Sequence, residues 1–174
     1  MIVTMLQGYP SMLLLVILTL IRYQCTELVN VMGEMASYNS IPDDFFASFY
    51  TTRQSDVIPA CVIRPLTPED VSVVVKTISK HSCHFAIKSG GHSMFAGASN
   101  ADGGITIDLK HLNGLELSED LSTARVGTAN RWGDVYGVLE PLGLVVVGGR
   151  VGHVGVGGFT LGGMWDAAMQ IGCR

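Results

Sequence analysis

Glycine is the feature that most restricts how this chain can fold. Eight of the sixteen residues from 148 to 163 are glycine, in the sequence Gly148-Gly-Arg-Val-Gly-His-Val-Gly-Val-Gly-Gly-Phe-Thr-Leu-Gly-Gly163. Glycine adds no side chain to a core, and it loses more backbone entropy on folding than any other residue. Something must therefore offset that entropy cost in this stretch, and a bound anion is a natural candidate.

A loop of small residues earlier in the chain, which we call the first loop, runs from Lys88 to Ser93 and continues through Gly97 to Asn100, and the stretch at 148–163 is then the second loop. Each loop follows an apolar segment that reads as a strand. Without Cβ atoms the main chain can adopt left-handed turns and point successive N–H groups at an anion such as a diphosphate. The two loops therefore favour an anion cradle. The alternative for the second loop is a set of tight turns or a glycine-packed strand.

The charge balance restricts the class of ligand. The chain has 174 residues, a net charge of −4 and a sequence pI near 5.6, and it contains no run of Lys and Arg. Nucleic-acid binding needs a basic face, so this composition argues against a nucleic-acid partner. Neutral main-chain donors would allow a net-acidic chain to hold a dinucleotide.

The N-terminus carries one strongly apolar run over residues 12–21, which ends at Arg22. A helix of this length rises about 15 Å, which is too short for the bilayer core, so we expect no stable membrane span. The length suits a secretory signal peptide over residues 1–22, and this predicts an extracellular protein. No positive charge precedes the run and no clear cleavage site follows it. A buried apolar helix and a wrongly assigned start codon are the alternatives.

Local patterns predict a mixed α/β domain with helices laid on sheets. Thr67 suits a helix N-cap, Pro68 suits the first helical position, and apolar residues then recur at helical spacing as far as Ile78. The predicted elements are a short helix near 43–52, a strand at 61–64, the helix after Thr67, strands at 85–88, 105–109 and 123–127, a helix capped by Asn130 that runs to Leu139, and an apolar strand at 144–147.

Common nucleotide and metal motifs fit poorly. In a Rossmann fingerprint Gly155 and Gly157 would supply the first two glycines, but the third position is Thr160, and no Gly-Lys-Ser/Thr closes a P-loop. The cluster of His81, Cys83 and His84 lacks a fourth ligand, so we predict no metal site.

The four cysteines, at positions 25, 61, 83 and 173, form no Cys-x-x-Cys pair. In a secreted chain Cys25 and Cys61 can close a disulfide, and the alternative is four buried thiols.

The segment Phe85-Ala-Ile-Lys-Ser-Gly-Gly-His-Ser93 resembles the first flavin loop of the PCMH-type FAD-binding domain. This domain occurs in berberine-bridge-enzyme-like and vanillyl-alcohol-oxidase-like oxidoreductases. Later segments resemble the fungal secreted branch of that family in the same order, at 103–109, 130–136, 142–150, 154–158 and 161–163. The resemblance covers residues 57–163, and it implies a mixed α+β fold of two small α/β subdomains.

The resemblance also implies a set of flavin contacts. His92 is the position that in many relatives bonds covalently to the 8α-methyl carbon of the isoalloxazine. Some relatives use a cysteine for a second covalent link, but Val151 stands there, so we expect none. His153 lies within the second loop and is a further flavin contact candidate, whereas Trp132 and Asp108 match packing and sheet-edge positions. The implied cofactor-binding residues are Lys88, Ser89, Gly90, Gly91, His92, Ser93, Gly97, Asn100, Gly148, Gly149, Val154, Gly155, Gly157, Gly158, Gly162 and Gly163.

The activity implied by the family is hydride transfer from an alcohol, a sugar or a secondary metabolite to FAD, with molecular oxygen as acceptor. After Gly163 the sequence departs from the family pattern, so we expect a C-terminally incomplete domain without its catalytic base. The expected organisation is a signal peptide at 1–22, an N-terminal extension at 23–56 and the FAD-binding domain at 57–174. The alternatives are a non-catalytic product with weak or no FAD binding, and an unrelated small α/β ligand-binding module.

Overall fold

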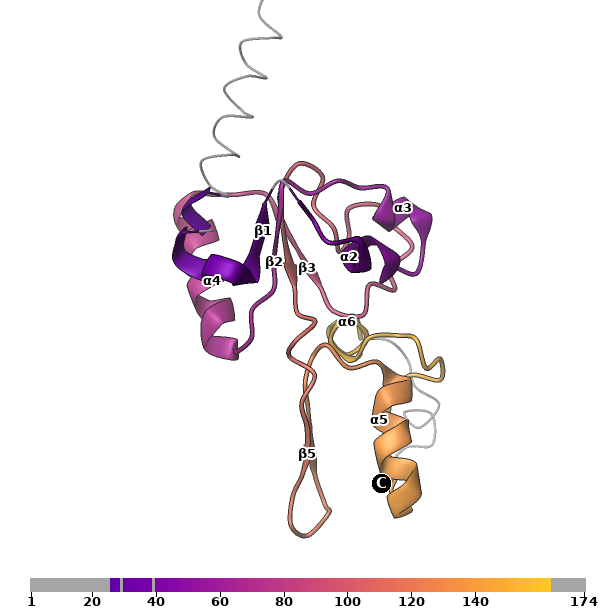
Figure 1. Cartoon of the computed structure of the whole chain (residues 1–174). Helices are drawn as coiled ribbons and strands as arrows, with labels where there is room; N and C mark the ends of the chain where they lie inside the picture. Colours follow the sequence, from indigo (N-terminus) through magenta and orange to yellow (C-terminus); the bar gives the residue numbers. More distant parts are fainter. Residues whose placement is uncertain (1–25, 29, 39, 164–174) are drawn as a thin grey trace, which may run out of the picture.

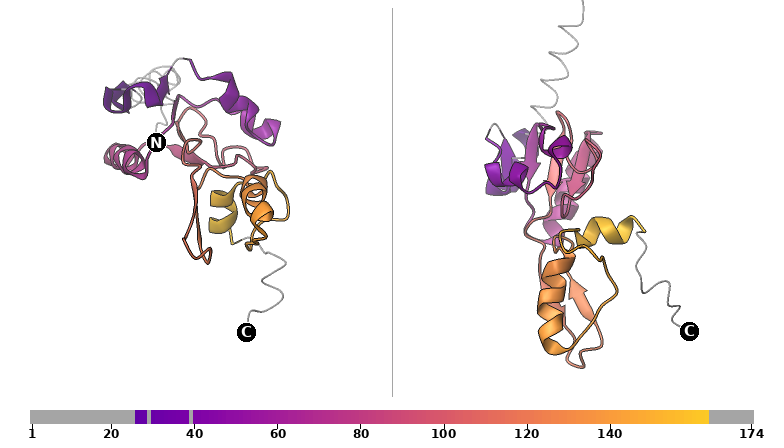
Figure 2. Two further views of the ribbon diagram at one scale, coloured as in Figure 1. Left: turned by 60° about the horizontal axis from the view of Figure 1, so that its bottom comes forward. Right: turned by 90° about the vertical axis from the view of Figure 1, so that its right-hand side faces the viewer.

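The chain folds into two bodies that meet at a narrow junction (Figure 1). The computed structural model describes residues 26–28, 30–38 and 40–163, so the predicted signal peptide at 1–22 lies outside the described residues. Figure 2 shows the same separation from two further directions. Within the described part, no helix has the length and apolarity that a membrane crossing requires. The predicted mixed α/β fold with two small subdomains is confirmed.

The first body is built on a four-stranded sheet with the strand order β1-β2-β4-β3. Strand β4 pairs in parallel with both β2 and β3, whereas β1 pairs antiparallel with β2. Strands β2 and β4 are buried along their whole length, which suits the near-continuous apolar sequences expected of parallel strands. The strands are β1 (Ala36–Tyr38), β2 (Cys61–Ile63), β3 (Phe85–Lys88) and β4 (Ile105–Asp108).

Helix α4 (Pro68–Lys80) packs against this sheet and confirms the predicted capping signals. The Thr67 side chain accepts a hydrogen bond from the Asp70 main-chain N–H, and the Asp70 carboxylate accepts from the Thr67 N–H, which completes a capping box. Val74 and Ile78 are buried in the sheet core. Two short helices, α2 (Asp43–Ala47) and α3 (Thr52–Ser55), lie on the other side of the sheet in Figure 1.

The second body consists of a hairpin, two helices and the connecting loops. Strand β5 (Leu115–Leu117) pairs antiparallel with β6 (Ala124–Val126), and helix α5 (Trp132–Leu139) packs against them. Trp132, Val135 and Leu139 form its buried core. Short 3₁₀ helices precede β1 (η1, Gly33–Met35) and follow α5 (η2, Glu140–Leu142), and helix α6 (Val156–Leu161) lies at the junction.

Three predicted elements differ from the structure. The helix expected near 43–52 is two helices, α2 and α3. The strand expected at 144–147 does not form, and Val145 is 97% exposed. Arg131 occupies the N-cap of α5, while the Asn130 side-chain amide donates to the main-chain oxygens of the hairpin loops at 113, 114 and 127.

The segment predicted as an N-terminal extension forms part of the first body. It supplies β1 and the two helices α2 and α3, and Phe45 of α2 is fully buried. Asn100, in the loop between β3 and β4, ties this segment to the sheet. Its amide nitrogen donates to the main-chain oxygens of Gln54 and Val57 at 2.9 and 2.8 Å, and its oxygen accepts from the Thr106 hydroxyl at 3.0 Å.

The substitution Asn100→Ala should destabilise the fold by about 2–4 kcal/mol, because it leaves several buried polar groups without partners. Urea unfolding followed by circular dichroism measures the change. Asn113→Ala is the matched control, because residue 113 is exposed and its main-chain oxygen is retained. Equal stability of the two variants would contradict a structural role for Asn100.

Candidate functional site

The two glycine-rich loops meet at the junction of the two bodies through main-chain contact. A Cβ atom on Gly90 would lie 2.5 Å from the Gly155 Cα, and a Cβ on Gly155 would lie 2.5 Å from the Gly90 nitrogen. Such distances leave no room for a side chain, so glycine is required at both positions. The two loops therefore lie together, as an anion cradle built from both requires.

Further contacts fix this meeting point. The Ser89 hydroxyl donates to the Thr128 oxygen at 2.6 Å, and Gly157 packs against both of these residues. Arg131 and Gly155 form an isolated antiparallel bridge, so the start of α5 and the start of α6 are joined at the same place. The junction is thus a main-chain structure with small side chains around it.

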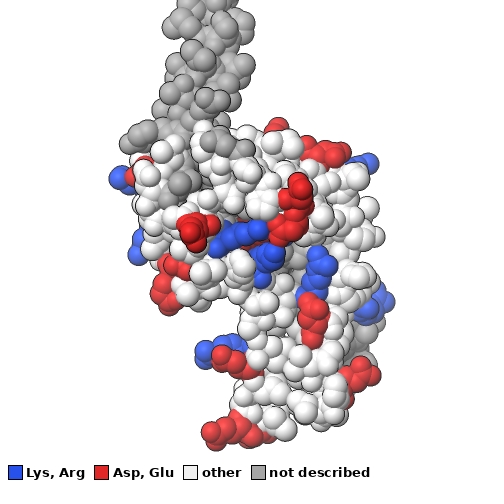
Figure 3. Space-filling view, in the orientation of Figure 1, with Lys and Arg blue, Asp and Glu red and all other residues white. Residues whose placement is uncertain are grey.

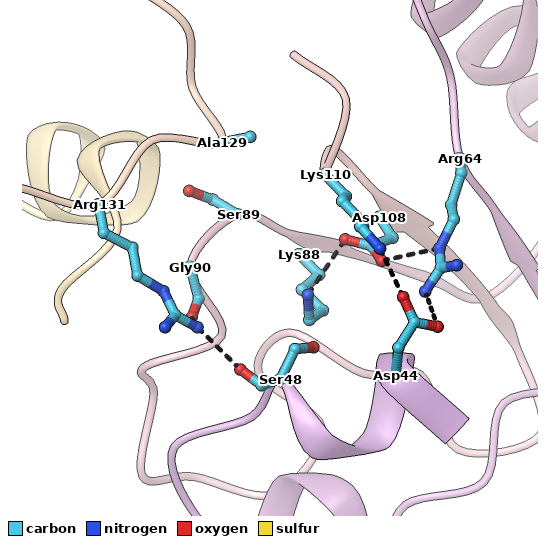
Figure 4. Close-up of a pocket in the computed structure, with 10 residues that line it drawn as sticks. All are labelled: Asp44, Ser48, Arg64, Lys88, Ser89, Gly90, Asp108, Lys110, Ala129 and Arg131. Atoms are coloured by element: carbon cyan, nitrogen blue, oxygen red, sulfur yellow. Dashed lines mark hydrogen bonds and ion pairs between the residues drawn. The ribbon is translucent and has the colours of Figure 1, made fainter. Parts of the chain in front are cut away.

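A cavity of about 260 Å³ opens beside the first loop (Figure 4). Four cationic side chains line it, those of Arg64, Lys88, Lys110 and Arg131, against the two carboxylates of Asp44 and Asp108. The excess of cations suits an anionic ligand group. Figure 3 shows basic and acidic side chains gathered together at the middle of this face, above the narrow junction. We call this hollow the cationic cavity.

Asp108 is the centre of the charge network in the cationic cavity. Its carboxylate is 3.1 Å from the Lys88 Nζ and 3.2 Å from the Arg64 Nε, and it is almost fully buried. Strand β4 lies inside the sheet, so the interpretation of Asp108 as a sheet-edge position is wrong. Both partners are cations, so the carboxylate neutralises positive charge at the carboxyl ends of the parallel strands.

Lys88 is also buried, with its ammonium 5.7 and 5.3 Å from the ring centres of Phe45 and Phe49. Burial lowers the pKa of Lys88, and the attraction of Asp108 opposes that change. The ion pair and the ring contacts hold α2 over the end of β3. Lys88 therefore organises the wall of the cationic cavity rather than projecting freely into it.

Asp44 closes the network at the surface. Hydrogen bonds from Lys110 and then from Arg64 lower the pKa of Asp44 from its ordinary value of 3.8 to about 2. Arg64 thus connects two carboxylates, one on α2 and one on β4.

A second cavity, of about 300 Å³, lies around His92, and we call it the histidine cavity. Its lining includes Tyr50, His92, Arg131 and His153. The His92 Nε2 atom is buried and has no hydrogen-bond partner among the described residues. A buried nitrogen without a partner is costly in a folded protein unless a ligand engages it.

Arg131 lines both cavities. Its guanidinium donates to the Ser48 oxygen at 3.1 Å and to the Gly90 oxygen at 3.4 Å (Figure 4). The side chain comes from the second body and its acceptors come from the first. One arginine therefore ties the two bodies together and supplies positive charge to both cavities.

The structure brings together only part of the predicted cofactor-binding set. Lys88, Ser89, Gly90, Gly91 and His92 lie at or beside the two cavities, and Val154, Gly155 and Gly157 meet them from the second loop. Gly148 and Gly149 instead pack against the ring of Trp132, which confirms a packing role for that tryptophan. Outside both cavity linings are Ser93, Gly97, Asn100, Gly158, Gly162 and Gly163.

Sequence reasoning missed Tyr50, Arg64, Arg131, Asp44 and Lys110. None of these residues lies in a recognisable motif. Only the fold brings them into the linings of the two cavities. Asp108 and His153 were noticed, and the structure places both in cavity linings. The only sequence signal for Arg131 was its place in the segment 130–136, which resembles the family.

The remaining predictions concern cysteines and metals. Cys61 is fully buried in the sheet core, and Cys25 lies outside the described residues, so their pairing stays a prediction. His81 contacts the Glu27 carboxylate at 2.8 Å. In the part of the chain that the structure describes, no three His, Cys, Asp or Glu side chains are grouped as metal ligands.

Both a family match and a similar known protein point to FAD binding. The sequence matches the FAD binding domain family over residues 59–170. The FAD-dependent monooxygenase tpcD of Cochliobolus heterostrophus is 46% identical over 115 residues, which are 66% of this chain and 22% of that protein. The matched region is therefore less than a quarter of that relative's length.

Solved structures agree in fold. Xylooligosaccharide oxidase from Myceliophthora thermophila superposes with a TM-score of 0.69 at 25% identity, over 79% of this chain and 30% of that one. The BBE-like 1 protein of Physcomitrella patens gives a TM-score of 0.67 at 21% identity, over the same 79% and 30%, which supports the fold alone.

Gly155→Ala should destabilise the protein by about 1–3 kcal/mol or more, because the added methyl group overlaps the Gly90 main chain. Gly137→Ala on α5 is the control, since nothing lies within 4 Å of its Cβ position. There the exchange should be neutral or stabilising. Chemical denaturation of both variants measures the difference, and an unchanged Gly155→Ala midpoint would contradict the close approach of the loops.

The Asp44 ion pairs should stabilise the fold by about 1 kcal/mol or less, because Asp44 is half exposed. The pKa of Asp44 is lower in the folded protein, so this contribution is present above pH about 4 and is lost as pH falls through about 2. Asp44→Asn should therefore be less stable than wild type at neutral pH, and the difference in unfolding free energy should shrink steadily between pH about 4 and about 2. Urea titrations across this range test this, with Asp43→Asn as control; a difference as large at pH 2 as at pH 7 would contradict it.

Proposed function

Since this chain belongs to the FAD binding domain family, we propose that the junction between its two bodies binds FAD for flavin-dependent oxidoreduction. The main chain at Gly90 and Gly155 approaches too closely for any side chain, which suits a cradle for a diphosphate. The cationic cavity beside it supplies positive charge from Arg64, Lys110 and Arg131. The single observation that carries the proposal is the meeting of both glycine loops beside a cation-rich cavity.

We propose His92 as the covalent attachment point for the flavin. Its Nε2 is buried, lacks a partner among the described residues and belongs to a cavity next to the loop junction. In the bond-forming reaction the His92 nitrogen and the 8α carbon each lose one proton as they join. Bound FAD would take up the two electrons that this bond formation releases, and dioxygen would be the oxidant that accepts them.

Bound FAD supplies the hydride acceptor, and the protein supplies binding, orientation and electrostatics. The substrate class we propose is an alcohol, a sugar or a secondary metabolite, with molecular oxygen as the electron acceptor. The names of the relatives support a small-molecule substrate, because they include a monooxygenase and an oxidase of xylooligosaccharides.

Purified protein incubated with FAD and then desalted should retain the visible absorbance of flavin. After acid precipitation the colour should remain in the wild-type pellet, and His92→Ala should release it to the supernatant. His111→Ala is the matched control, because this exposed histidine lies outside both cavity linings.

Two outcomes would contradict the proposal separately. Protein that stays colourless after incubation contradicts FAD binding by this chain and favours a non-catalytic product. Wild-type protein that binds flavin but releases all of it in acid contradicts the His92 bond alone.

A further inference from the structure

Tyr50 and His92 lie face to face in the histidine cavity. Their ring centres are 4.0 Å apart and their planes differ by 17°. Tyr50 is still 59% exposed, so its ring covers the imidazole on one side and faces solvent on the other. This contact involves a residue about forty positions earlier in the chain, in the loop between α2 and α3.

The main chain around Tyr50 is tied to the first glycine loop independently of the Tyr50 ring. The Tyr50 N–H donates to the Gly91 oxygen at 3.0 Å. Arg131 donates to the oxygens of both Ser48 and Gly90, so it bridges the same two segments (Figure 4). Removal of the phenol ring would therefore leave the path of the backbone in place.

The His92 imidazole lacks the usual means of orientation. Histidine rings at functional sites are commonly held by a hydrogen bond to one ring nitrogen. Among the described residues no hydrogen bond reaches the His92 ring, and its Nε2 is buried without a partner. The stack on Tyr50 therefore restricts rotation of the imidazole about its Cβ–Cγ bond.

We propose that Tyr50 is a positioning residue that holds the His92 imidazole in the orientation needed for bond formation with flavin. The reacting nitrogen must approach the 8α carbon along one direction, and a freely rotating ring presents it only part of the time. The stack also shields one face of the imidazole from water. This inference rests on the proposed His92 bond but predicts an effect that is measurable without any cofactor.

The first test uses the protein without FAD. Stacking on the Tyr50 ring should shift the His92 ring protons upfield in the NMR spectrum, and His92→Ala assigns these resonances. Tyr50→Leu should move them downfield, whereas Tyr50→Phe should keep them in place because it retains an aromatic ring. Phe95→Leu, which removes another exposed aromatic three residues after His92, should have no effect.

The second test measures covalent attachment. Tyr50→Leu should slow the appearance of acid-stable flavin by about two- to tenfold at equal FAD occupancy, the range that corresponds to the energy of one aromatic pair. Tyr50→Phe should attach flavin at the wild-type rate, and so should Phe95→Leu.

The outcomes separate this inference from the proposed function. An unmoved His92 resonance in Tyr50→Leu, or a wild-type attachment rate in that variant, overturns the role of Tyr50. Wild-type protein that takes up no FAD overturns the proposed function instead. In that case the NMR comparison of the cofactor-free variants still tests whether Tyr50 orients His92.

Discussion

The contact between Gly90 and Gly155 is the constraint on which the site depends. Each of these residues lies where a Cβ atom would meet the main chain of the other, so the two bodies are as close here as polypeptides can come. Arg131, next to this contact, reaches from the second body to main-chain oxygens of the first. Both cavities take their position from this meeting point, because Gly90 and Arg131 belong to the lining of each.

The distribution of charge explains how an acidic chain can offer an anion site. The net charge is −4, yet the cationic cavity gathers four basic side chains around two carboxylates. Asp108 is buried between Lys88 and Arg64 and holds them side by side, which two cations would not do unaided. Composition alone describes the average surface, whereas function here depends on where a few ionic groups are placed.

The sequence predicted elements whose signals are local and missed those set by distant partners. Helix α4 was predictable because Thr67, Pro68 and Asp70 specify its start within four residues. The apolar run at 144–147 looked like a strand, but a strand needs a neighbour for its hydrogen bonds, and no local pattern reveals one. Likewise the glycine loops were recognisable from their composition. Asp44 and Tyr50 were not, because they line the cavities only once the segment with α2 and α3 has folded against the sheet.

The segment that carries α2 and α3 lies before the family match but contributes to both cavities. The family match begins at residue 59, so a recombinant version trimmed to the recognisable region would start after α2 and α3. It would lack Asp44 from one cavity and Tyr50 from the other, and Arg131 would lose its Ser48 acceptor. The domain boundary given by sequence similarity therefore differs from the boundary of the binding surface. Only the second boundary keeps the linings of both cavities complete.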